Sequence, residues 1–239
     1  MFGLGTLIDT AAIILAGFIG KFFGDRLNER HQNGISMATG VSVLFIGISG
    51  AMSGMLKLSH DNLASGQSML VVACLSLGAL LGEIINIEDA FERLGHWLKL
   101  KTGNNKDSDS EFVNAFVVST LTVSIGAMAI IGPIQDGING DISLLLTKSV
   151  LDFIIVVIMT SSLGKGAAFS AIPVFILQGT ITALSRLLKP YMTITALANI
   201  SLVGSILIFC VGLNLVFGKK IRVANMLPAL IFAVLIAYF

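Results

Sequence analysis

Eight long apolar stretches follow one another along this chain of 239 residues. Each is about 17 to 25 residues long, near the length that an α-helix needs to cross the hydrocarbon of a bilayer. The chain is 55% hydrophobic and only 12% charged, which excludes an ordinary soluble domain. Lipid satisfies no backbone hydrogen bonds and the sequence shows no alternating ten-residue strands, so we predict an all-α integral membrane protein of about eight transmembrane helices. The predicted spans cover residues 4–22, 35–55, 67–86, 113–133, 142–162, 168–186, 194–217 and 223–238.

The basic residues of the loops predict the orientation of these spans. Eight spans place both termini on one side, and eleven lysines and arginines then fall in loops on the opposite side, against three on the terminal side. Because cytoplasmic loops hold the excess of Lys and Arg, we predict a multi-pass protein of the cytoplasmic membrane with both termini outside. The first apolar stretch has no basic residue before it and no small-residue cleavage site after it, so we expect it to be retained.

We predict a single polytopic membrane domain over residues 1–239, with a short soluble insertion. Residues 1–87 hold the first three spans, residues 88–111 an amphipathic cytoplasmic helix with a linker, and residues 112–239 five further spans. Apolar side chains recur every three or four residues in the amphipathic segment, and Trp97 suits an interfacial anchor. We therefore expect this helix to lie along the inner membrane surface, followed by a flexible polar linker over residues 102–110. The apolar positions are Ile84, Ile87, Phe91, Leu94 and Leu98.

Lys148 and Asp152 form the strongest functional lead, because they lie four residues apart within one predicted span. This spacing places one charge of each sign on the same side of the helix. Charges at membrane depth are costly, so they face a bundle interior, a partner or a water-filled path. Two interpretations remain open: Lys148 neutralises Asp152 and fixes helix packing, or the pair lies on the pathway of a solute or ion.

Asp9 is a second aspartate within a predicted span. It lies about one and a half turns from the outer end of the first span, whereas Asp152 lies near the predicted midplane. We therefore expect different roles: Asp9 reaches outer water and acts as an entrance, while Asp152 exchanges a proton or sodium ion as its pair with Lys148 opens. The substitution Asp152→Asn is predicted to abolish transport or ion coupling and to leave the protein folded.

The chain also shows a weak internal similarity. Residues 7–20 align without a gap to residues 169–182, and shorter matches follow in order, so spans 1 to 3 correspond to spans 6 to 8. An offset of five spans reverses the orientation, which predicts an inverted-topology repeat of the kind found in secondary transporters. Coincidence between apolar segments is the alternative.

Several polar residues lie within or beside interrupted spans. Gly132 and Pro133 are predicted to break the fourth span, and Gln135 and Asp136 follow on the outer side. A broken or re-entrant helix here would free backbone groups to line a cavity. An ordinary outer turn with solvated acids is the alternative. The remaining pathway candidates are Gln178 in the sixth span, Asn214 near the inner end of the seventh and Asn225 at the start of the eighth. Each of these three amides could instead bond a neighbouring helix.

No motif of enzymatic chemistry occurs in the sequence. Cys74 and Cys210 lie within spans without a partner motif, and His31, His60 and His96 are isolated. The sequence contains no nucleophile elbow, phosphate loop or dinucleotide fingerprint. We therefore expect no enzyme, no cofactor, no metal site and no nucleic-acid partner.

An ordered set of short motifs resembles the bacterial membrane protein family described as domain of unknown function 554. The resemblance covers nearly the whole chain and implies a prokaryotic inner-membrane protein with several spans. It carries over no catalytic or binding residue, and Asp9 stands where that family is expected to have an asparagine. The motifs are Gly5-Thr6, residues 126–130, Asp136-Gly137, Gly140-Asp141, Lys148 with Asp152, Gln178-Gly179, residues 212–214 and residues 220–229.

The function that these patterns favour is that of a small secondary transporter or permease. It would move a small solute, coupled to H⁺ or Na⁺ at the Asp152–Lys148 pair, and its surroundings are the lipid bilayer. An ion channel is the closest alternative, and a non-catalytic membrane scaffold or assembly protein is a third. A thin bundle of this length also makes a homodimer plausible.

Overall fold

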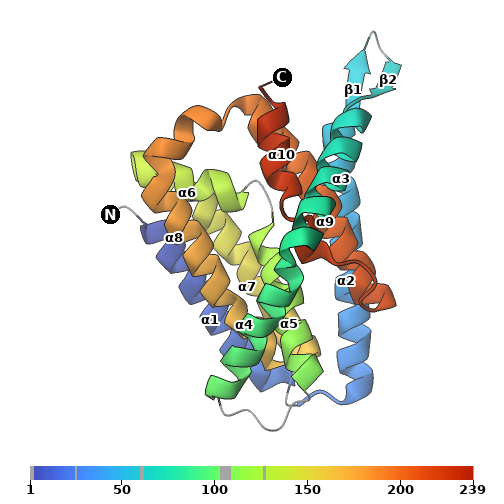
Figure 1. Cartoon of the computed structure of the whole chain (residues 1–239). Helices are drawn as coiled ribbons and strands as arrows, with labels where there is room; N and C mark the ends of the chain where they lie inside the picture. The colour runs from blue at the N-terminus through green and yellow to red at the C-terminus, as the bar shows by residue number, and fades with distance from the viewer. Residues whose placement is uncertain (1–2, 25, 60–61, 103–108, 126–127, 239) are drawn as a thin grey trace. The chain divides into compact units, whose positions relative to one another are not determined.

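The computed structural model describes residues 3–24, 26–59, 62–102, 109–125 and 128–238 of the chain. Most of the linker predicted over residues 102–110, and Gly126 and Ala127 of the family motifs, lie outside these ranges. The described residues are predominantly helical, which confirms the predicted all-α membrane class (Figure 1). The long helices are α1 (Leu4–Gly24), α2 (Glu29–Met55), α3 (Ser68–Ile85), α4 (Ile87–Thr102), α5 (Asp109–Ser124), α6 (Met128–Asn139), α7 (Ser143–Leu163), α8 (Ala171–Leu188), α9 (Ile194–Phe217) and α10 (Ala229–Ile236).

Short elements join several of these helices. Two antiparallel strands, β1 (Leu56–Ser59) and β2 (Asn62–Ser65), form a hairpin between α2 and α3, with Leu56 opposite Ser65 and Ser59 opposite Asn62. Three single-turn or two-turn 3₁₀ helices are η1 (Lys165–Ser170), η2 (Lys189–Tyr191) and η3 (Val223–Met226). Helix η1 runs directly into α8, and η3 precedes α10, so both predicted spans in these regions contain irregular helix.

Six helices of the described chain are long and apolar enough to cross a membrane, and a seventh span is possible from two bent pieces. Those pieces belong to α5 and α6, which meet at an angle of 60°. A broken fourth span was predicted, but its position was wrong: Gly132 and Pro133 lie inside α6, and the break precedes Met128. Pro133 lies in the middle of this twelve-residue helix, where it removes one backbone hydrogen bond without ending the helix.

The predicted eighth span also differs from the structure. The apolar segment Val223–Ile236 is shorter than the spanning helices and consists of η3, a turn and the eight-residue α10. Pro228 immediately precedes α10, and it restricts the backbone where the two helical pieces meet. Hydropathy had extended the span through this irregular region. The structure therefore supports six to seven long spans and one short, interrupted segment.

The chain divides into two compact units, each built from segments far apart in sequence. The first contains residues 1–39, 89–124 and 128–189; the second contains residues 40–88, 125–127 and 190–239. Each unit therefore contains helices from before and after the segment 88–111. The single membrane domain expected over residues 1–239 stays a prediction.

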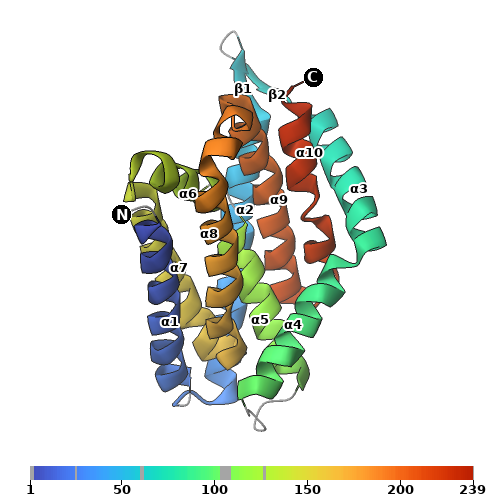
Figure 2. The ribbon, with the colours of Figure 1, turned by 60° about the vertical axis from the view of Figure 1, so that its left-hand side comes forward.

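Helix α1 packs against α7 and α8 in the first unit (Figure 2). Glycines make the approach to α7 close: a Cβ on Gly20 would lie 2.6 Å from the carbonyl oxygen of Val157, and one on Gly24 would lie 3.0 Å from the Cα of Ser161. Small residues at such contacts are typical of membrane helices, since packing rather than water expulsion drives their association. The buried apolar core around this contact contains Ile13, Ala16, Val123, Val156, Ala171 and Val174.

Glycines also bring together the helices of the second unit. Gly47 of α2 lies against the backbone of Phe209 in α9. A Cβ on Gly47 would lie 2.5 Å from the backbone nitrogen of Phe209. Gly78 of α3 faces Ala229 of α10 in the same manner, and the Asn199 amide donates to the carbonyl of Ala233 over 3.1 Å. These contacts leave no room for larger side chains at the glycine positions.

The predicted amphipathic helix is present as α4, although part of its apolar face contacts protein. Leu98 is buried, and Gly95 packs against Phe116 of α5. Trp97 is 54% exposed, and the Lys101 ammonium lies 5.8 Å from the centre of its ring. This exposed pair suits the interfacial anchor that the sequence predicted, whereas the position of α4 on the membrane surface stays a prediction.

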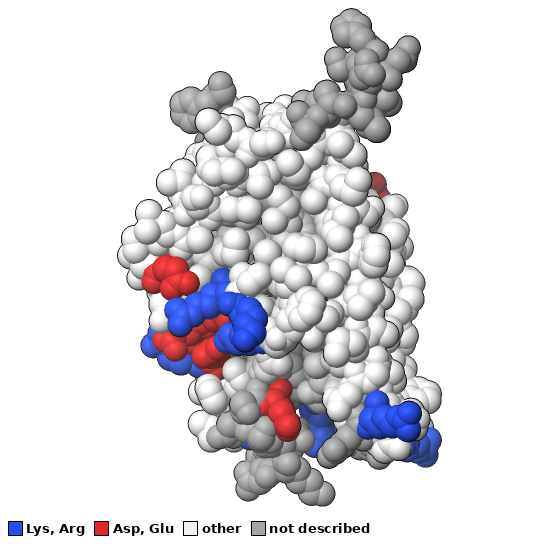
Figure 3. All heavy atoms as spheres, turned by 90° about the vertical axis from the view of Figure 1, so that its right-hand side faces the viewer, with Lys and Arg blue, Asp and Glu red and all other residues white. Residues whose placement is uncertain are grey.

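The surface is mostly uncharged, as a protein surrounded by lipid requires. On the face shown in Figure 3, uncharged residues form a broad area, and lysine, arginine, aspartate and glutamate occupy only small patches of it. Large apolar side chains such as Phe45, Met69 and Val72 are strongly exposed. A soluble protein rarely exposes such extensive apolar surface, so this agrees with placement in a membrane.

Candidate functional site

A cluster of four polar side chains lies inside the first unit, where α1, α7 and α8 meet. The Lys148 ammonium of α7 bonds Asp152 one turn further along the same helix, and it lies 3.1 Å from Asp9 Oδ2 on α1. Gln178 of α8 donates from Nε2 to the same Asp9 oxygen over 2.5 Å. Two carboxylates therefore share one ammonium, and an amide completes the group. We call these four residues the acid–base cluster.

Helix periodicity and small residues place the cluster. Lys148 and Asp152 lie on the buried face of α7 with Leu145, Ser149 and Val156. On α1, Asp9 lies on the face that also contains Thr6, Ile13, Ala16 and Gly20. Because α1 approaches α7 so closely, the short Asp9 side chain reaches the ammonium directly.

Burial makes this cluster unusual. Asp9 is completely buried, Gln178 is 1% exposed, Asp152 is 4% exposed and Lys148 is 5% exposed. Asp9 Oδ1 and Gln178 Oε1 are also buried, and neither has a hydrogen-bond partner among the residues that the structure describes. A buried acceptor without a donor costs free energy on the order of 1–3 kcal/mol. Within the described residues, the cluster thus contains two buried oxygens without a hydrogen-bond donor.

The structure corrects the separate role expected for Asp9. We had expected Asp9 to reach outer water as an entrance, apart from the Lys148–Asp152 pair. Its side chain is instead fully buried and bonded to Lys148 and Gln178. The sequence separates residues 9 and 148 widely, so no local spacing could show that α1 packs on α7 at this depth. The predicted contact between Lys148 and Asp152 is present.

Asp136 binds the first turn of α1 and not the cluster. Its carboxylate accepts hydrogen bonds from the backbone N–H groups of Gly3, over 3.1 Å, and Gly5, over 2.9 Å. These amides have no partner within the helix, and a negative charge there complements the helix dipole. Asp136 is completely buried, and its neighbour Gln135 is half-buried on α6. This contact joins α6 to the start of α1.

A pocket of about 510 Å³ lies beside the cluster, between α1, α6 and α8. Its lining includes Thr6 and Thr182, whose hydroxyl oxygens lie 3.4 Å apart, and the exposed Arg186. Thr6 lies one turn from Asp9 on α1, and Gly179 of the lining directly follows Gln178 on α8. The pocket therefore begins about one helical turn from the cluster. We call it the vestibule.

The other two predicted pathway residues belong to the second unit and bind backbone groups. Asn214 accepts hydrogen bonds from the N–H groups of Lys220 and Ile221, both over 2.9 Å, and its amide donates to the Ile221 carbonyl over 2.7 Å. It thereby closes the loop after α9. Asn225 accepts from the backbone N–H of Glu88 over 2.7 Å. Both arrangements are those of residues that hold loops and helix ends.

Sequence reasoning missed the vestibule residues. Thr6, Thr182 and Ser185 are common residue types, and their hydroxyls often bond the backbone of their own helix. Only the spacing of Thr6 and Asp9, and of Gln178 and Thr182, signals that each pair shares a helix face. Which faces meet depends on tertiary packing.

Comparisons with known proteins place this chain among membrane proteins. The model of the family described as "Protein of unknown function (DUF554)" matches residues 4–238. The chain belongs to this family. It is 30% identical over 227 residues to "Uncharacterized membrane protein YdfK" of Bacillus subtilis (strain 168), covering 95% of this chain and 92% of that protein. It is also 31% identical over 232 residues to "Uncharacterized protein YqgA" of Escherichia coli (strain K12), covering 96% of this chain and 94% of that protein. No solved structure matches.

Proposed function

We propose that this DUF554 protein is a secondary transporter that couples movement of a small polar solute to H⁺ or Na⁺. The acid–base cluster is the coupling site, and the vestibule is the route by which solute or ion reaches it. The observation that carries the proposal is the charge ratio of the cluster: two buried carboxylates share one ammonium.

The charge ratio implies an exchangeable cation. With both carboxylates ionised, the cluster holds one excess negative charge in a region of low dielectric, which costs several kcal/mol. One proton or one monovalent cation removes that excess. Asp9 Oδ1 and Gln178 Oε1 supply buried oxygen acceptors for it. A fully matched ion pair would have no reason to bind and release such a cation.

The irregular helices support a transport role as well. Secondary transporters form their sites from discontinuous helices, because freed backbone groups can line a cavity. In the first unit, α5 and α6 meet at an angle of 60°, and the 3₁₀ helix η1 interrupts the α-helical path before α8. The vestibule is lined by α6 and α8, so interrupted segments border the proposed route.

The lining of the vestibule favours a small organic acid as solute. It offers the hydroxyls of Thr6, Thr182 and Ser185 together with the cationic Arg186. A guanidinium binds a carboxylate in bidentate geometry, and hydroxyls complete such a site. We therefore place carboxylates first among the solutes to be screened.

The test uses purified protein in liposomes on a solid-supported membrane. Organic acids, amino acids and cations are applied under H⁺ and Na⁺ gradients, and an internal pH dye detects electroneutral exchange. We expect a saturable, gradient-dependent signal that Asp152→Asn reduces at least tenfold. Asp141→Asn is the matched control, since Asp141 is exposed in the turn before α7 and makes the same chemical change.

Three results would contradict the proposal. A current that rises linearly without saturation, independent of the ion gradients, would indicate a channel. Full activity of Asp152→Asn would remove the cluster from the mechanism. Silence in both the electrical and the dye measurement would favour a scaffold role.

A further inference from the structure

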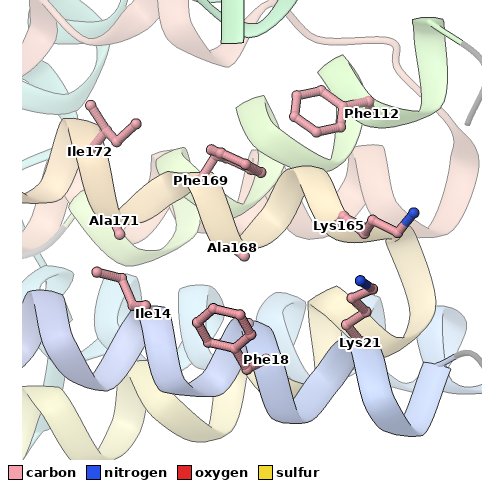
Figure 4. A pocket seen from close by; sticks show the side chains of 10 residues that line it. Ile14, Phe18, Lys21, Phe112, Lys165, Ala168, Phe169, Ala171 and Ile172 are labelled. Carbon is pink, nitrogen blue, oxygen red and sulfur yellow. The ribbon is translucent and has the colours of Figure 1, made fainter. Parts of the chain in front are cut away.

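A second pocket of about 510 Å³ lies in the first unit, between α1, η1 and α8 (Figure 4). Its walls are apolar over most of their length and include Ile14, Phe18, Phe169 and Ile172. Two of its lining residues are lysines, Lys21 and Lys165, and none of the lining residues that the structure describes is acidic. The acid–base cluster contributes no residue to this pocket.

The two lysines lie together at one end of the apolar walls. Lys21 belongs to the last turn of α1 and Lys165 is the first residue of η1. Figure 4 shows both ammonium groups at the same end of the pocket, with Ile14 and Ile172 at the other. Seven residues of helix separate Lys21 from Ile14, a distance of about 10 Å along the axis. The pocket is therefore cationic at one end and apolar along its length.

The pocket opens toward the surroundings of the protein. Phe18 is 70% exposed and Ile14 is 45% exposed, although both line it. At this apolar surface the surrounding medium is the hydrocarbon of the membrane. The distribution of basic residues among the loops predicts a cytoplasmic location for Lys21 and Lys165, where anionic headgroups attract basic residues near the membrane. A ligand with one anionic head and an apolar tail matches both ends.

We propose that this pocket binds an anionic glycerophospholipid of the cytoplasmic leaflet. The headgroup phosphate lies against the ammonium groups of Lys21 and Lys165. One acyl chain follows Phe18, Ile14, Phe169 and Ile172 along the groove between α1 and α8. A zwitterionic lipid with the same chains binds more weakly, because its own cationic group opposes the two lysines.

The test is native mass spectrometry of the purified full-length protein. It is titrated with phosphatidylglycerol and with phosphatidylcholine of identical acyl chains, and the fraction of protein with bound lipid is measured. We expect tighter binding of phosphatidylglycerol. The double variant Lys21→Gln/Lys165→Gln should weaken it about 30-fold and leave phosphatidylcholine unchanged. The control Lys189→Gln/Lys220→Gln removes two exposed charges elsewhere and should bind as the wild type does.

A further variant and a competing ligand test whether the apolar part of the pocket binds an acyl chain. Ile172→Trp fills the groove without changing charge, so both lipids should bind more weakly. Glycerol 3-phosphate should not displace phosphatidylglycerol at equal concentration. Gel filtration and circular dichroism confirm that each variant is folded.

Three results would overturn the lipid assignment. Unchanged phosphatidylglycerol binding by the folded double-lysine variant would exclude a headgroup site. Efficient displacement by glycerol 3-phosphate would indicate a soluble phosphate site instead. Equal binding of the two lipids by the wild-type protein would remove the charge preference.

Discussion

Each unit of the molecule buries a group of charged and polar side chains. Within the part of the chain that the structure describes, the two groups leave different kinds of atom without a partner: carboxylate and amide oxygens in one, an amide nitrogen in the other. In the second unit, Glu88 Oε1 lies 2.8 Å from the Lys219 ammonium, and Glu88 Oε2 accepts from the N–H of Ala224 over 3.2 Å. Both oxygens of the Glu88 carboxylate have a partner there, and among the described residues the buried atom of this group that has none is a donor, Asn225 Nδ2. In the acid–base cluster of the first unit, two acids meet one base and Asp9 Oδ1 has no partner among the described residues.

This difference separates structure from function. The Glu88 group joins the start of α4 to η3, because the Glu88 backbone N–H donates to Asn225 and the Glu88 carboxylate accepts from Ala224. The acid–base cluster stabilises its helices only if a proton or cation corrects its charge. A buried ion pair alone is thus a weak indication of function. An uneven ratio of buried acids and bases is a stronger one.

The largest expected effect is the loss of stability in Lys148→Met. The substitution leaves Asp9 and Asp152 buried without their shared cation, so the free energy of unfolding should fall by about 3–5 kcal/mol. The measurement is SDS-induced unfolding in mixed micelles. Lys219→Met is the counterpart in the second unit, where the ammonium side chain is 45% exposed, and should cost about 1 kcal/mol. If the two variants lost equal free energy of unfolding, the two groups would not differ in how strongly they depend on their lysine.

Charge-removing amides should have opposite consequences in the two groups. In Asp152→Asn one carboxylate remains for Lys148, so stability should change little while transport is lost. In Glu88→Gln the amide oxygen still accepts from Ala224, but the ion pair between Glu88 and Lys219 is lost, and stability should fall by about 1–2 kcal/mol. Transport per folded molecule should survive. Unfolding curves and liposome currents are measured for both variants. If Glu88→Gln lost transport and Asp152→Asn kept it, the coupling site would lie in the Glu88 group and not in the acid–base cluster.

Obstructing the vestibule should affect transport without affecting stability. A Cβ on Gly179 meets open space, so Gly179→Leu fits the fold and places a bulky side chain in the pocket. We expect transport to fall at least tenfold and the unfolding free energy to stay within about 0.5 kcal/mol, since leucine favours helix over glycine. Gly34→Leu is the control, because Gly34 also faces open space but lies in the first turns of α2. Normal transport by a folded Gly179→Leu protein would exclude this route.

The smallest effect concerns an exposed acid that belongs to neither group. The backbone N–H of Ser143 donates to Asp141 over 3.0 Å and lowers the pKa of that carboxyl. A depressed folded-state pKa contributes stability above the ordinary aspartate value of about 4, and this contribution is lost as pH falls through the folded pKa. The stability difference between wild type and Asp141→Ala should therefore shrink in acid. Thermal unfolding across pH measures it, and a difference that grows toward low pH would have the wrong sign.

The sequence predicted the parts of this structure that local spacing controls. The bounds expected for α9 match those observed, and the four-residue spacing of Lys148 and Asp152 predicted their contact. The break between α5 and α6 was expected at Gly132 and Pro133, but one proline in a short helix does not end it. The contacts of Asp9 with Lys148 and Gln178 depend on how three helices pack, which no single-helix pattern encodes. The inverted repeat and the outside location of both termini stay predictions.

The central claim is that the acid–base cluster holds one exchangeable cation, and infrared spectroscopy of the carboxyl groups tests it most directly. In sodium-free buffer the purified wild-type protein should show the carbonyl stretch of one buried, protonated carboxylic acid, which shifts in heavy water. The band should disappear in Asp152→Asn and in Asp9→Asn, and it should persist in Asp141→Asn. If both carboxylates of the wild-type cluster remain ionised across pH without sodium, the cluster needs no proton and the proposed coupling site is contradicted.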